Sequence, residues 1–267
     1  MRPFFSVITV TKNTEKKINL TIKSVLSQNF KNFEYIVIDG YSKDNTFVNI
    51  KKYQDKRIKV FKYRDKGFYD GLNYGVQNSK GKYIAILNSG DIFYSNKILF
   101  LMKKKIMEFN KYQFFFSNLL YIDKDIKIKR IWKNSYFDNT LEDAFKIAHP
   151  TIFIKKEVAQ RFKYNLIYKI SSDLDFILRL LRNKIRFKYL NIFSIVMEQG
   201  GMSSSLRYLL IKLREDLIIH RKYFKYYIVN FLKKKITKLK SLRLENKKNI
   251  SNKISETIKH ISSKNFY

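Results

Sequence analysis

The sequence predicts an α/β fold with a mostly parallel sheet flanked by helices, and three observations support this. Short β-branched and aromatic runs alternate with segments of helical periodicity over roughly the first 90 residues, as in repeated βαβ units. Clusters of polar residues follow the ends of the apolar runs. The chain of 267 residues is 45% hydrophobic and can therefore bury a large core.

Four apolar runs are expected to be buried strands. They cover residues 5–10, 33–38, 58–62 and 83–87. Helices are expected between them: one capped by Asn13 or Thr14, a short one ending near Tyr53, and one over residues 69–80. Parallel strands joined in this way place their carboxyl ends at one edge of the sheet, where ligands of such sheets bind.

Three polar clusters fall at those predicted strand ends. They are Thr11-Lys12-Asn13, Asp39-Gly40 and Asn88-Ser89-Gly90-Asp91. Each cluster alone is typical of a turn. Their shared position at one edge indicates a binding site.

The second half of the chain is less regular. Residues 114–122 and 126–132 predict a hairpin, and residues 151–156 predict a strand after His149-Pro150. A helix is expected to open at Ser171-Ser172-Asp173. From Leu206 the chain becomes basic, with 17 Lys and Arg against four Asp and Glu in residues 206–267. We therefore expect a catalytic domain over 1–205 and a basic helical extension over 206–267.

The charge and the missing residue types limit the classes of function. Lys and Arg number 55 against 22 Asp and Glu, a formal net charge of +33, which indicates an anionic partner. Without cysteine the chain has neither disulfides nor a zinc–thiolate site. We expect no signal peptide and no membrane-spanning helix, because no run of about 18 apolar residues occurs. A cytoplasmic protein is expected, either free or peripheral on the inner face of the membrane.

Eight segments, in order, resemble the nucleotide-sugar glycosyltransferases of family 2, which have the GT-A fold. The resemblance covers about residues 5–205, and its segments are SVITVTKN, SVLSQNF, YIVIDGYSKDNT, DKGFYDGLNYG, SKGKYIAILNSGD, HPTIFIKK, SSDLDFILRL and GGMSS. DKGFYDGLN together with LNSGD is similar to members that build bacterial surface polysaccharides.

The resemblance implies an inverting glycosyltransferase. Such an enzyme moves a sugar from a nucleotide-sugar donor, here expected to be UDP-linked, to a glycan or lipid-linked acceptor in surface-polysaccharide synthesis. Negative charge develops on the leaving diphosphate and needs a divalent cation or basic side chains. The acceptor hydroxyl is a poor nucleophile and needs a carboxylate base.

The resemblance also assigns donor-binding residues. Asp39 corresponds to the family's acid that binds the nucleotide base, with Thr11 and Asn13 in the neighbouring loop. Asp70 and Asn73 belong to the segment placed against the ribose and donor sugar, and the role of Asp65 in that segment stays open. The alternative for all of them is a turn, a helix cap or a solvated position.

The expected metal ligand is Asp91. Asn88 and Gly90 stand where the family has its two aspartates, and Asp91 follows them. Mg²⁺ or Mn²⁺ is commonly held by one or two carboxylates together with substrate phosphates. Asn88 is expected to offer a neutral oxygen or to bind the donor, and basic residues to share the phosphate charge. The alternative for Asp91 is a helix-capping turn residue before Tyr94-Ser95.

By the same resemblance, the expected catalytic base is Asp173, since the family's base opens a helix across the cleft from the metal loop. An N-cap role is the alternative, because acids favour this position in any helix. Asp175 is a rival, but two positions further along a helix it would point elsewhere. His149 is expected on the acceptor side, with a purely structural role as its alternative.

Two other readings stay open. A sugar-nucleotide nucleotidyltransferase would need a glycine-rich loop after the first strand, and VTKNTEKK lacks glycine. A catalytically inactive GT-A-fold binding protein, with a basic surface for membrane or nucleic acid, is favoured by the missing Asp-x-Asp. We expect no nucleic-acid partner. The C-terminal extension is expected either to lie on an anionic membrane surface or to pack on the catalytic domain with its charged face in solvent.

Overall fold

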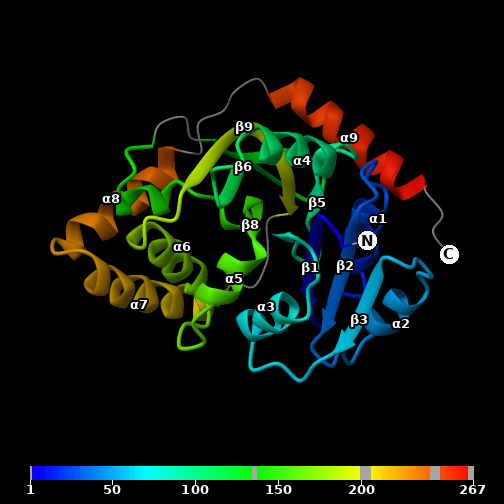
Figure 1. The fold of residues 1–267 in the computed structure, drawn as a ribbon, viewed down its shortest axis with the longest axis horizontal. Coiled ribbons are helices and arrows are strands. Elements are labelled where there is room, and N and C mark those ends of the chain that lie inside the picture. The colour runs from blue at the N-terminus through cyan, green and yellow to red at the C-terminus, as the bar shows by residue number, and fades with distance from the viewer. Residues whose placement is uncertain (1, 134–136, 199–205, 241–246, 264–267) are drawn as a thin grey trace.

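The computed structural model describes residues 2–133, 137–198, 206–240 and 247–263, shown in Figure 1. The predicted GGMSS segment therefore lies outside the described residues. The strands are β1 (Phe5–Thr11), β2 (Phe33–Asp39), β3 (Ile58–Lys62), β4 (Tyr83–Ile86), β5 (Ile92–Phe93), β6 (Phe114–Ile122), β7 (Ile128–Trp132), β8 (Phe153–Lys155) and β9 (Phe187–Glu198). The helices are α1 (Ile18–Leu26), α2 (Thr46–Lys51), α3 (Phe68–Gln77), α4 (Ile98–Glu108), α5 (Lys156–Phe162), α6 (Ser172–Arg182), α7 (Leu206–Tyr223), α8 (Tyr227–Lys240) and α9 (Lys247–Ser263), with 3₁₀ turns η1 (Leu141–Phe145) and η2 (His149–Thr151).

The described strands form one mixed sheet. Its order is β3-β2-β1-β4-β8-β6-β9-β5, with β7 paired to β6. The first four strands in this order are parallel, and β8 runs antiparallel to both β4 and β6. The carboxyl ends of β1, β2 and β4 therefore lie at one edge, as the sequence predicts.

Apolar side chains fill both faces of the sheet, which explains why β1 is buried along its whole length. Ile8 and Val10 point into one core cluster, and Phe5 and Val7 into the other. The close packing of α3 on the first face depends on two glycines. A Cβ on Gly71 would lie 2.7 Å from a Val10 methyl, and one on Gly75 would lie 2.6 Å from an Ile8 methyl. The DGLNYG segment thus lets the helix lie directly on β1.

The predicted strands, the hairpin β6–β7 and the helix that opens near Asp173 are confirmed. The expected cap of the first helix is wrong, and the capping alternative for Asp91 is excluded. Helix α1 begins at Ile18 rather than directly after Asn13 or Thr14, because Asn13 adopts a left-handed φ of 53° and Thr14 bonds to neighbouring loops. Asp91 is not a helix-capping residue either, since it leads into β5, which pairs with β9, and α4 begins only at Ile98.

The C-terminal helices fold back onto the rest of the chain. Helix α7 packs against α6 and α8 against η1, while α9 lies along α1 (Figure 1). Ile254 and Ile261 of α9 are buried. Over the described residues, each helix is too short or too polar to cross a bilayer.

Candidate functional site

A chain of hydroxyl groups joins the loops after β1 and β4. The Oγ1 atoms of Thr11 and Thr14 share a hydrogen bond at 2.5 Å, and the Ser89 hydroxyl donates to Thr14 Oγ1 at 2.8 Å. Thr11 itself is buried. The predicted donor-site residue Thr11 therefore lies inside the network that holds the two loops together.

Asp39 ends β2 and is connected to the same edge through Ser42. Its carboxylate accepts the Ser42 hydroxyl at 2.5 Å and the Ser42 backbone N–H at 3.1 Å. The Ser42 hydroxyl in turn accepts the backbone N–H of Asn13 at 2.9 Å, and Asn13 Oδ1 accepts the N–H of Lys43 at 2.8 Å. Ser42 thus links Asp39 to Asn13. The Asp39 side chain is fully buried.

Asp65 lies against the turn that follows Asp39. A Cβ on Gly40 would come within 2.6 Å of Asp65 Oδ2, so a larger residue there would push this carboxylate aside. Burial raises the pKa of Asp65, and the charges of Asp70 and Asp39 raise it further. The hydrogen bond from the Gly67 N–H and the charge of Lys12 lower it. Asp70 accepts the backbone N–H of Lys66 at 2.9 Å. These acids therefore share one electrostatic environment at the edge of the sheet.

Asn88 and Asp91 face each other within the loop after β4. The Asn88 amide donates to Asp91 Oδ2 at 3.0 Å, and the Asp91 N–H donates to the Asn88 carbonyl at 2.9 Å. Gly90 between them has φ 99°, which favours glycine. Burial raises the pKa of Asp91 to about 8, while the Asn88 bond and Lys17 lower it and Glu198 raises it.

This loop fits a divalent cation that is shared with a substrate. Asn88 Oδ1 is buried and has no hydrogen-bond partner among the described residues, and the Asp91 carboxyl is beside it. Over the same residues, no group of three or more His, Cys, Asp or Glu side chains could hold a metal. A Mg²⁺ or Mn²⁺ ion here would thus need oxygens from a bound phosphate and water, which is common for Mg²⁺.

Asp173 lies in the first turn of α6 and is only partly buried. Its Oδ1 accepts the backbone N–H of Leu174 at 2.8 Å. Burial and then the charge of Asp173 raise the pKa of the Tyr69 hydroxyl on α3, which donates to the Ile170 carbonyl at 2.8 Å. Asp173 is therefore close to the helix that carries Asp70.

Tyr121 on β6 connects Asp173 with the Asn88–Asp91 loop. Burial raises the pKa of Tyr121 to about 12, Arg130 lowers it, and the charges of both Asp91 and Asp173 raise it. The Tyr121 hydroxyl is thus close enough to both carboxyl groups for their charges to affect its pKa. The charges of the predicted metal ligand and of the predicted base therefore act on the same hydroxyl.

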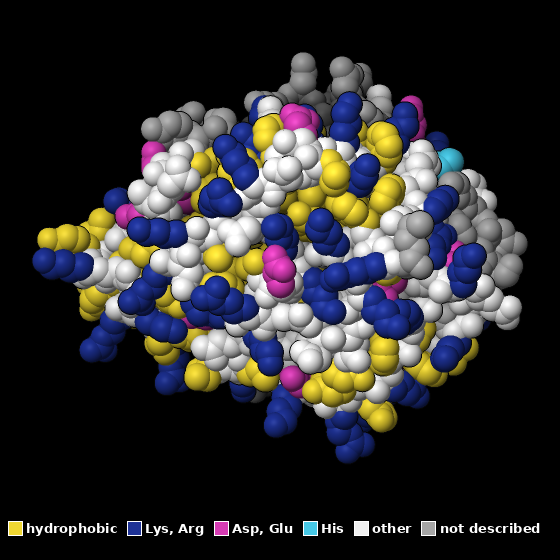
Figure 2. All heavy atoms as spheres, viewed as in Figure 1, with side chains coloured by type: hydrophobic (Ala, Val, Ile, Leu, Met, Phe, Trp, Pro, Cys, Tyr) yellow, Lys and Arg dark blue, Asp and Glu magenta, His cyan; other side chains and the backbone are white. Residues whose placement is uncertain are grey.

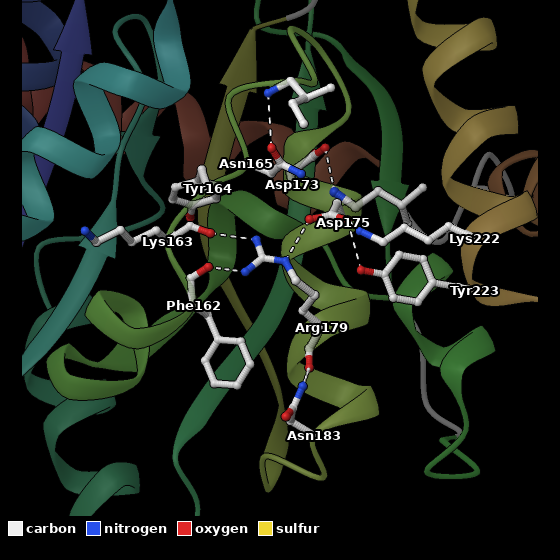
Figure 3. Close-up of polar contacts among 12 residues, drawn as sticks. Phe162, Lys163, Tyr164, Asn165, Asp173, Asp175, Arg179, Asn183, Lys222 and Tyr223 are labelled. Carbon is white, nitrogen blue, oxygen red and sulfur yellow. Dashed lines mark hydrogen bonds and ion pairs between the residues drawn. The ribbon is translucent and has the colours of Figure 1, made fainter.

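Asp175 points away from Asp173 into a separate ion-pair network, as the helical spacing predicts. Figure 3 shows three side chains converging on it. Arg179 contacts Asp175 at 2.7 Å, Lys222 at 3.2 Å, and the Tyr223 hydroxyl donates to it at 2.9 Å. Arg179 also donates to the carbonyls of residues 162 and 163. Asp175 is fully buried and holds α6 to α7.

His149 and Asn73 both bond to Tyr164, which precedes α6. His149 Nε2 and the Tyr164 hydroxyl are 2.8 Å apart, and burial lowers the pKa of His149 while Asp173 raises it. The Asn73 amide donates to the Tyr164 carbonyl at 2.9 Å, and its Oδ1 accepts the Tyr164 N–H at 2.7 Å. Both ends of the Asn73 side chain are therefore engaged within the protein.

Sequence reasoning missed the residues that support Asp173 from α7. The Glu215 carboxylate accepts the backbone N–H groups of residues 169, 170 and 171 at 2.7, 2.9 and 2.9 Å. Asp216 accepts the Ser171 hydroxyl at 2.7 Å and pairs with Lys234 at 2.7 Å. An acidic pair within an otherwise basic segment was the only signal. The salt bridge of Lys17 to Glu198 at 3.3 Å, beside Asp91, was also missed.

Comparisons with known proteins identify relatives of this chain. The model of the family described as "Glycosyl transferase family 2" matches residues 6–166. An uncharacterized glycosyltransferase of Methanocaldococcus jannaschii is 31% identical over 203 residues, which are 72% of this chain and 69% of that protein. The Escherichia coli protein WfaP, a UDP-Glc:α-D-GlcNAc-diphosphoundecaprenol β-1,3-glucosyltransferase, is 36% identical over 48% of this chain and 51% of its own length. An uncharacterized Rickettsia bellii glycosyltransferase is 37% identical, but only 21% of its length is matched.

Solved structures show the same fold. Staphylococcus aureus TarS in complex with UDP aligns with a TM-score of 0.64 and 18% identity, over 98% of this chain and 72% of that one. The Pyrobaculum calidifontis mannosyltransferase PcManGT, in complex with GDP-Man and Mn²⁺, aligns with a TM-score of 0.62 and 14% identity, over 99% and 76%. The predicted GT-A arrangement is confirmed.

Proposed function

Because the chain belongs to glycosyltransferase family 2, we propose that it moves a sugar, with inversion, from a UDP-linked donor to a lipid-linked acceptor in surface-glycan synthesis. A UDP donor and a lipid-diphosphate acceptor appear in the name of the related E. coli enzyme.

The observation that supports the proposal is the shared sheet edge of Asp39 and Asp91, together with the Tyr69–Ile170 hydrogen bond that ties α3 to the start of α6. Asp39 and Asp91 follow strands whose carboxyl ends share that edge, and the hydroxyl chain connects their loops. Asp173 belongs to a helix from another part of the chain, and the charges of Asp91 and Asp173 both raise the pKa of the Tyr121 hydroxyl on β6. A donor bound along the edge would place its sugar between Asp91 and Asp173.

Donor binding would use the first two loops and α3. Asp39, with Thr11 and Asn13 beside it, would face the nucleotide base. Asp70, in the first turn of α3, would face the ribose or the sugar. Lys12 lies beside Gly40 and Asp65, and Lys17 lies beside Gly90, so two cations flank the path of the diphosphate.

Asp173 would remove the proton from the acceptor hydroxyl as that oxygen attacks the anomeric carbon. The bond from that carbon to the diphosphate breaks in the same step, so the configuration inverts and no covalent sugar–enzyme intermediate forms. Asp173 is partly exposed and can therefore reach an incoming alcohol, whereas Asp175 is closed off by its ion pairs. His149 would orient the acceptor side through Tyr164.

A divalent cation, when bound, would stabilise the negative charge on the departing diphosphate. Asn88 Oδ1 and the Asp91 carboxylate would hold it. Asp91 would have to lose its proton first, because burial raises the pKa of Asp91 to about 8.

A screen of UDP-, GDP- and dTDP-sugars with and without Mn²⁺ tests the proposal. Binding is read as a rise in the unfolding temperature, and turnover as release of the nucleoside diphosphate. We expect one UDP-sugar to stabilise the protein and to be turned over, with Asp91→Ala losing the Mn²⁺-dependent part of the stabilisation and Asp173→Ala losing turnover while it retains donor binding.

One feature favours a second candidate, a GT-A-fold protein that binds without catalysis. Asn88 and Gly90 leave a single carboxylate, Asp91, in the loop after β4. That protein would bind a nucleotide sugar or an anionic surface and show no turnover with any donor. If no donor, acceptor or metal in the same screen gave turnover, this result would support the binding protein and contradict the proposed sugar transfer.

A further inference from the structure

Helices α7 and α8, which pack on each other, expose eight large apolar side chains on or between them. On α7 these are Leu209, Leu210, Leu217 and Ile218, which are 43–62% exposed. On α8 they are Ile228, Val229 and Leu232, at 52–57%, with Tyr226 between the helices at 68%. Both sets recur at helical spacing. Soluble proteins routinely expose single apolar residues, but a cluster of this size on two adjacent helices indicates an interaction site.

The charged side chains that the described residues of α7 and α8 expose are all basic. Arg214, Arg221 and Lys225 are exposed beside it, and Figure 2 shows basic and hydrophobic side chains together at the end of the molecule where α7 meets α8. The two acids of α7, Glu215 and Asp216, are both buried and turned to the loop before α6. Helix α7 thus turns its acids toward the protein, while leucines and basic side chains are exposed together.

We propose that this surface, named here the α7–α8 face, docks on an anionic lipid bilayer. Leu210, Leu217, Ile218, Ile228, Val229 and Leu232 enter the boundary between headgroups and acyl chains, and the arginines and Lys225 contact the lipid phosphates. The proposal stands independently of the transfer chemistry, since it uses none of the residues placed in the donor site.

The charge on the face decides between a bilayer and a second copy of the chain. Two α7–α8 faces brought together would bury arginines and lysines against one another, and the described residues of α7 and α8 expose no acid to neutralise them. The whole chain, at a formal net charge of +33, repels its own copies as well. Anionic lipid satisfies the apolar and the cationic residues at the same time.

Flotation of the full chain with vesicles tests the proposal. One set of vesicles contains equal parts phosphatidylglycerol and phosphatidylcholine, and the other contains phosphatidylcholine alone. We expect the protein to float with the first set and to bind the second at least ten-fold more weakly. High salt should weaken the binding to anionic vesicles, because it screens the headgroup charge.

A triple variant Leu210→Ser, Leu217→Ser, Ile218→Ser addresses the apolar part. These side chains are exposed, so the fold should persist, and binding to anionic vesicles should fall at least ten-fold. The matched control is Val48→Ser, Phe100→Ser, Met107→Ser, which removes three apolar side chains of 52–55% exposure elsewhere on the molecule. Circular dichroism and the unfolding temperature check that both variants are folded.

Three outcomes would overturn the proposal. One is equal flotation of the α7–α8 variant and the control variant. Another is equal binding of the unmodified chain to anionic and neutral vesicles. The third is a concentration-dependent dimer in sedimentation experiments that the α7–α8 variant abolishes while vesicle binding stays absent, since this would assign the face to a second copy.

Discussion

The carboxylate of Glu215 accepts the backbone N–H of Ser171 at 2.9 Å and thereby ties α7 to the residue before α6. The same carboxylate takes the N–H groups of the two preceding residues. Three peptide groups that would otherwise need water are satisfied by one side chain from the C-terminal part of the sequence. Helix α7 therefore positions the first turn of α6, which carries Asp173.

Glu215→Gln should reduce catalysis through the position of Asp173. The amide keeps one acceptor oxygen and presents an NH₂ group to peptide donors, so at least one bond is lost. We expect the free energy of unfolding to fall by about 1–3 kcal/mol and kcat to fall by roughly ten-fold or more, with little change in the KM for the donor. Kinetics and urea unfolding measure both effects.

The matched control for Glu215→Gln is Glu157→Gln, which makes the same change at an exposed site in α5. It should alter neither quantity. An unchanged kcat in Glu215→Gln, alongside the expected loss of stability, would show that the carboxylate supports the fold without positioning the base.

Asp173→Asn and Asp175→Asn should separate catalysis from packing. Asp173 accepts the backbone N–H of Leu174 and is partly exposed, so the Asp173→Asn variant should fold normally and its kcat should fall by roughly a thousand-fold. Asp175 is buried against Arg179, Lys222 and Tyr223. The Asp175→Asn variant loses the charge that pairs with these partners, so its free energy of unfolding should fall by about 3–5 kcal/mol.

Unfolding midpoints and single-turnover rates distinguish the two variants. If Asp173→Asn kept full turnover, the proposed base would be wrong. If Asp175→Asn left the midpoint unchanged, the network drawn in Figure 3 would contribute nothing measurable.

Much of the catalytic half could be predicted from the sequence because its signals are local. Alternating β-branched runs define β1 to β4, and polar residues such as Asp39 and Asp91 follow them directly. Parallel connections then fix the common edge. Asp175 could be separated from Asp173 for the same reason, since helical geometry alone turns the two side chains apart.

The remaining features depend on contacts between distant segments. Nothing near Glu215 in the sequence indicates that it binds the backbone 44 to 46 residues earlier. Asn73 occurs in a donor-site motif, yet its partner Tyr164 is 91 residues away. The strand β5 after Asp91 is two residues long and exists through its pairing with β9. Local propensity carries no information on such partners.

The raised pKa of Asp91 should make the stability of the metal-free protein depend on pH. Burial raises the pKa of Asp91 from 3.8 to about 8, so the folded state favours the neutral carboxyl. The resulting stabilisation is complete below about pH 4 and is lost as the pH rises through about 8. Each pH unit in this window costs about 1.4 kcal/mol at most.

Thermal unfolding in EDTA between about pH 6 and about pH 8 measures this loss. The midpoint of the unmodified chain should fall over the range, while that of Asp91→Asn should change much less because the amide does not titrate. Identical pH profiles for the two proteins would contradict a buried, neutral Asp91.

Asn73→Ala should decide whether this residue binds the donor or holds the chain together. Its amide makes two hydrogen bonds to the backbone of Tyr164, whose hydroxyl contacts His149 and whose ring stacks on Phe176 of α6. Removing the amide leaves a buried N–H and a carbonyl without these partners. The free energy of unfolding should therefore fall by about 1–3 kcal/mol.

The affinity of Asn73→Ala for the donor, measured by calorimetry, should stay within about three-fold of the unmodified protein, less than 1 kcal/mol. Asn78→Ala is the matched control, because Asn78 follows the same helix and its amide donates only to the Tyr74 carbonyl at 2.9 Å. It should lose less stability than Asn73→Ala. A ten-fold weaker donor affinity with unchanged stability would instead assign Asn73 to the donor, because only a direct contact could weaken binding without loosening the fold.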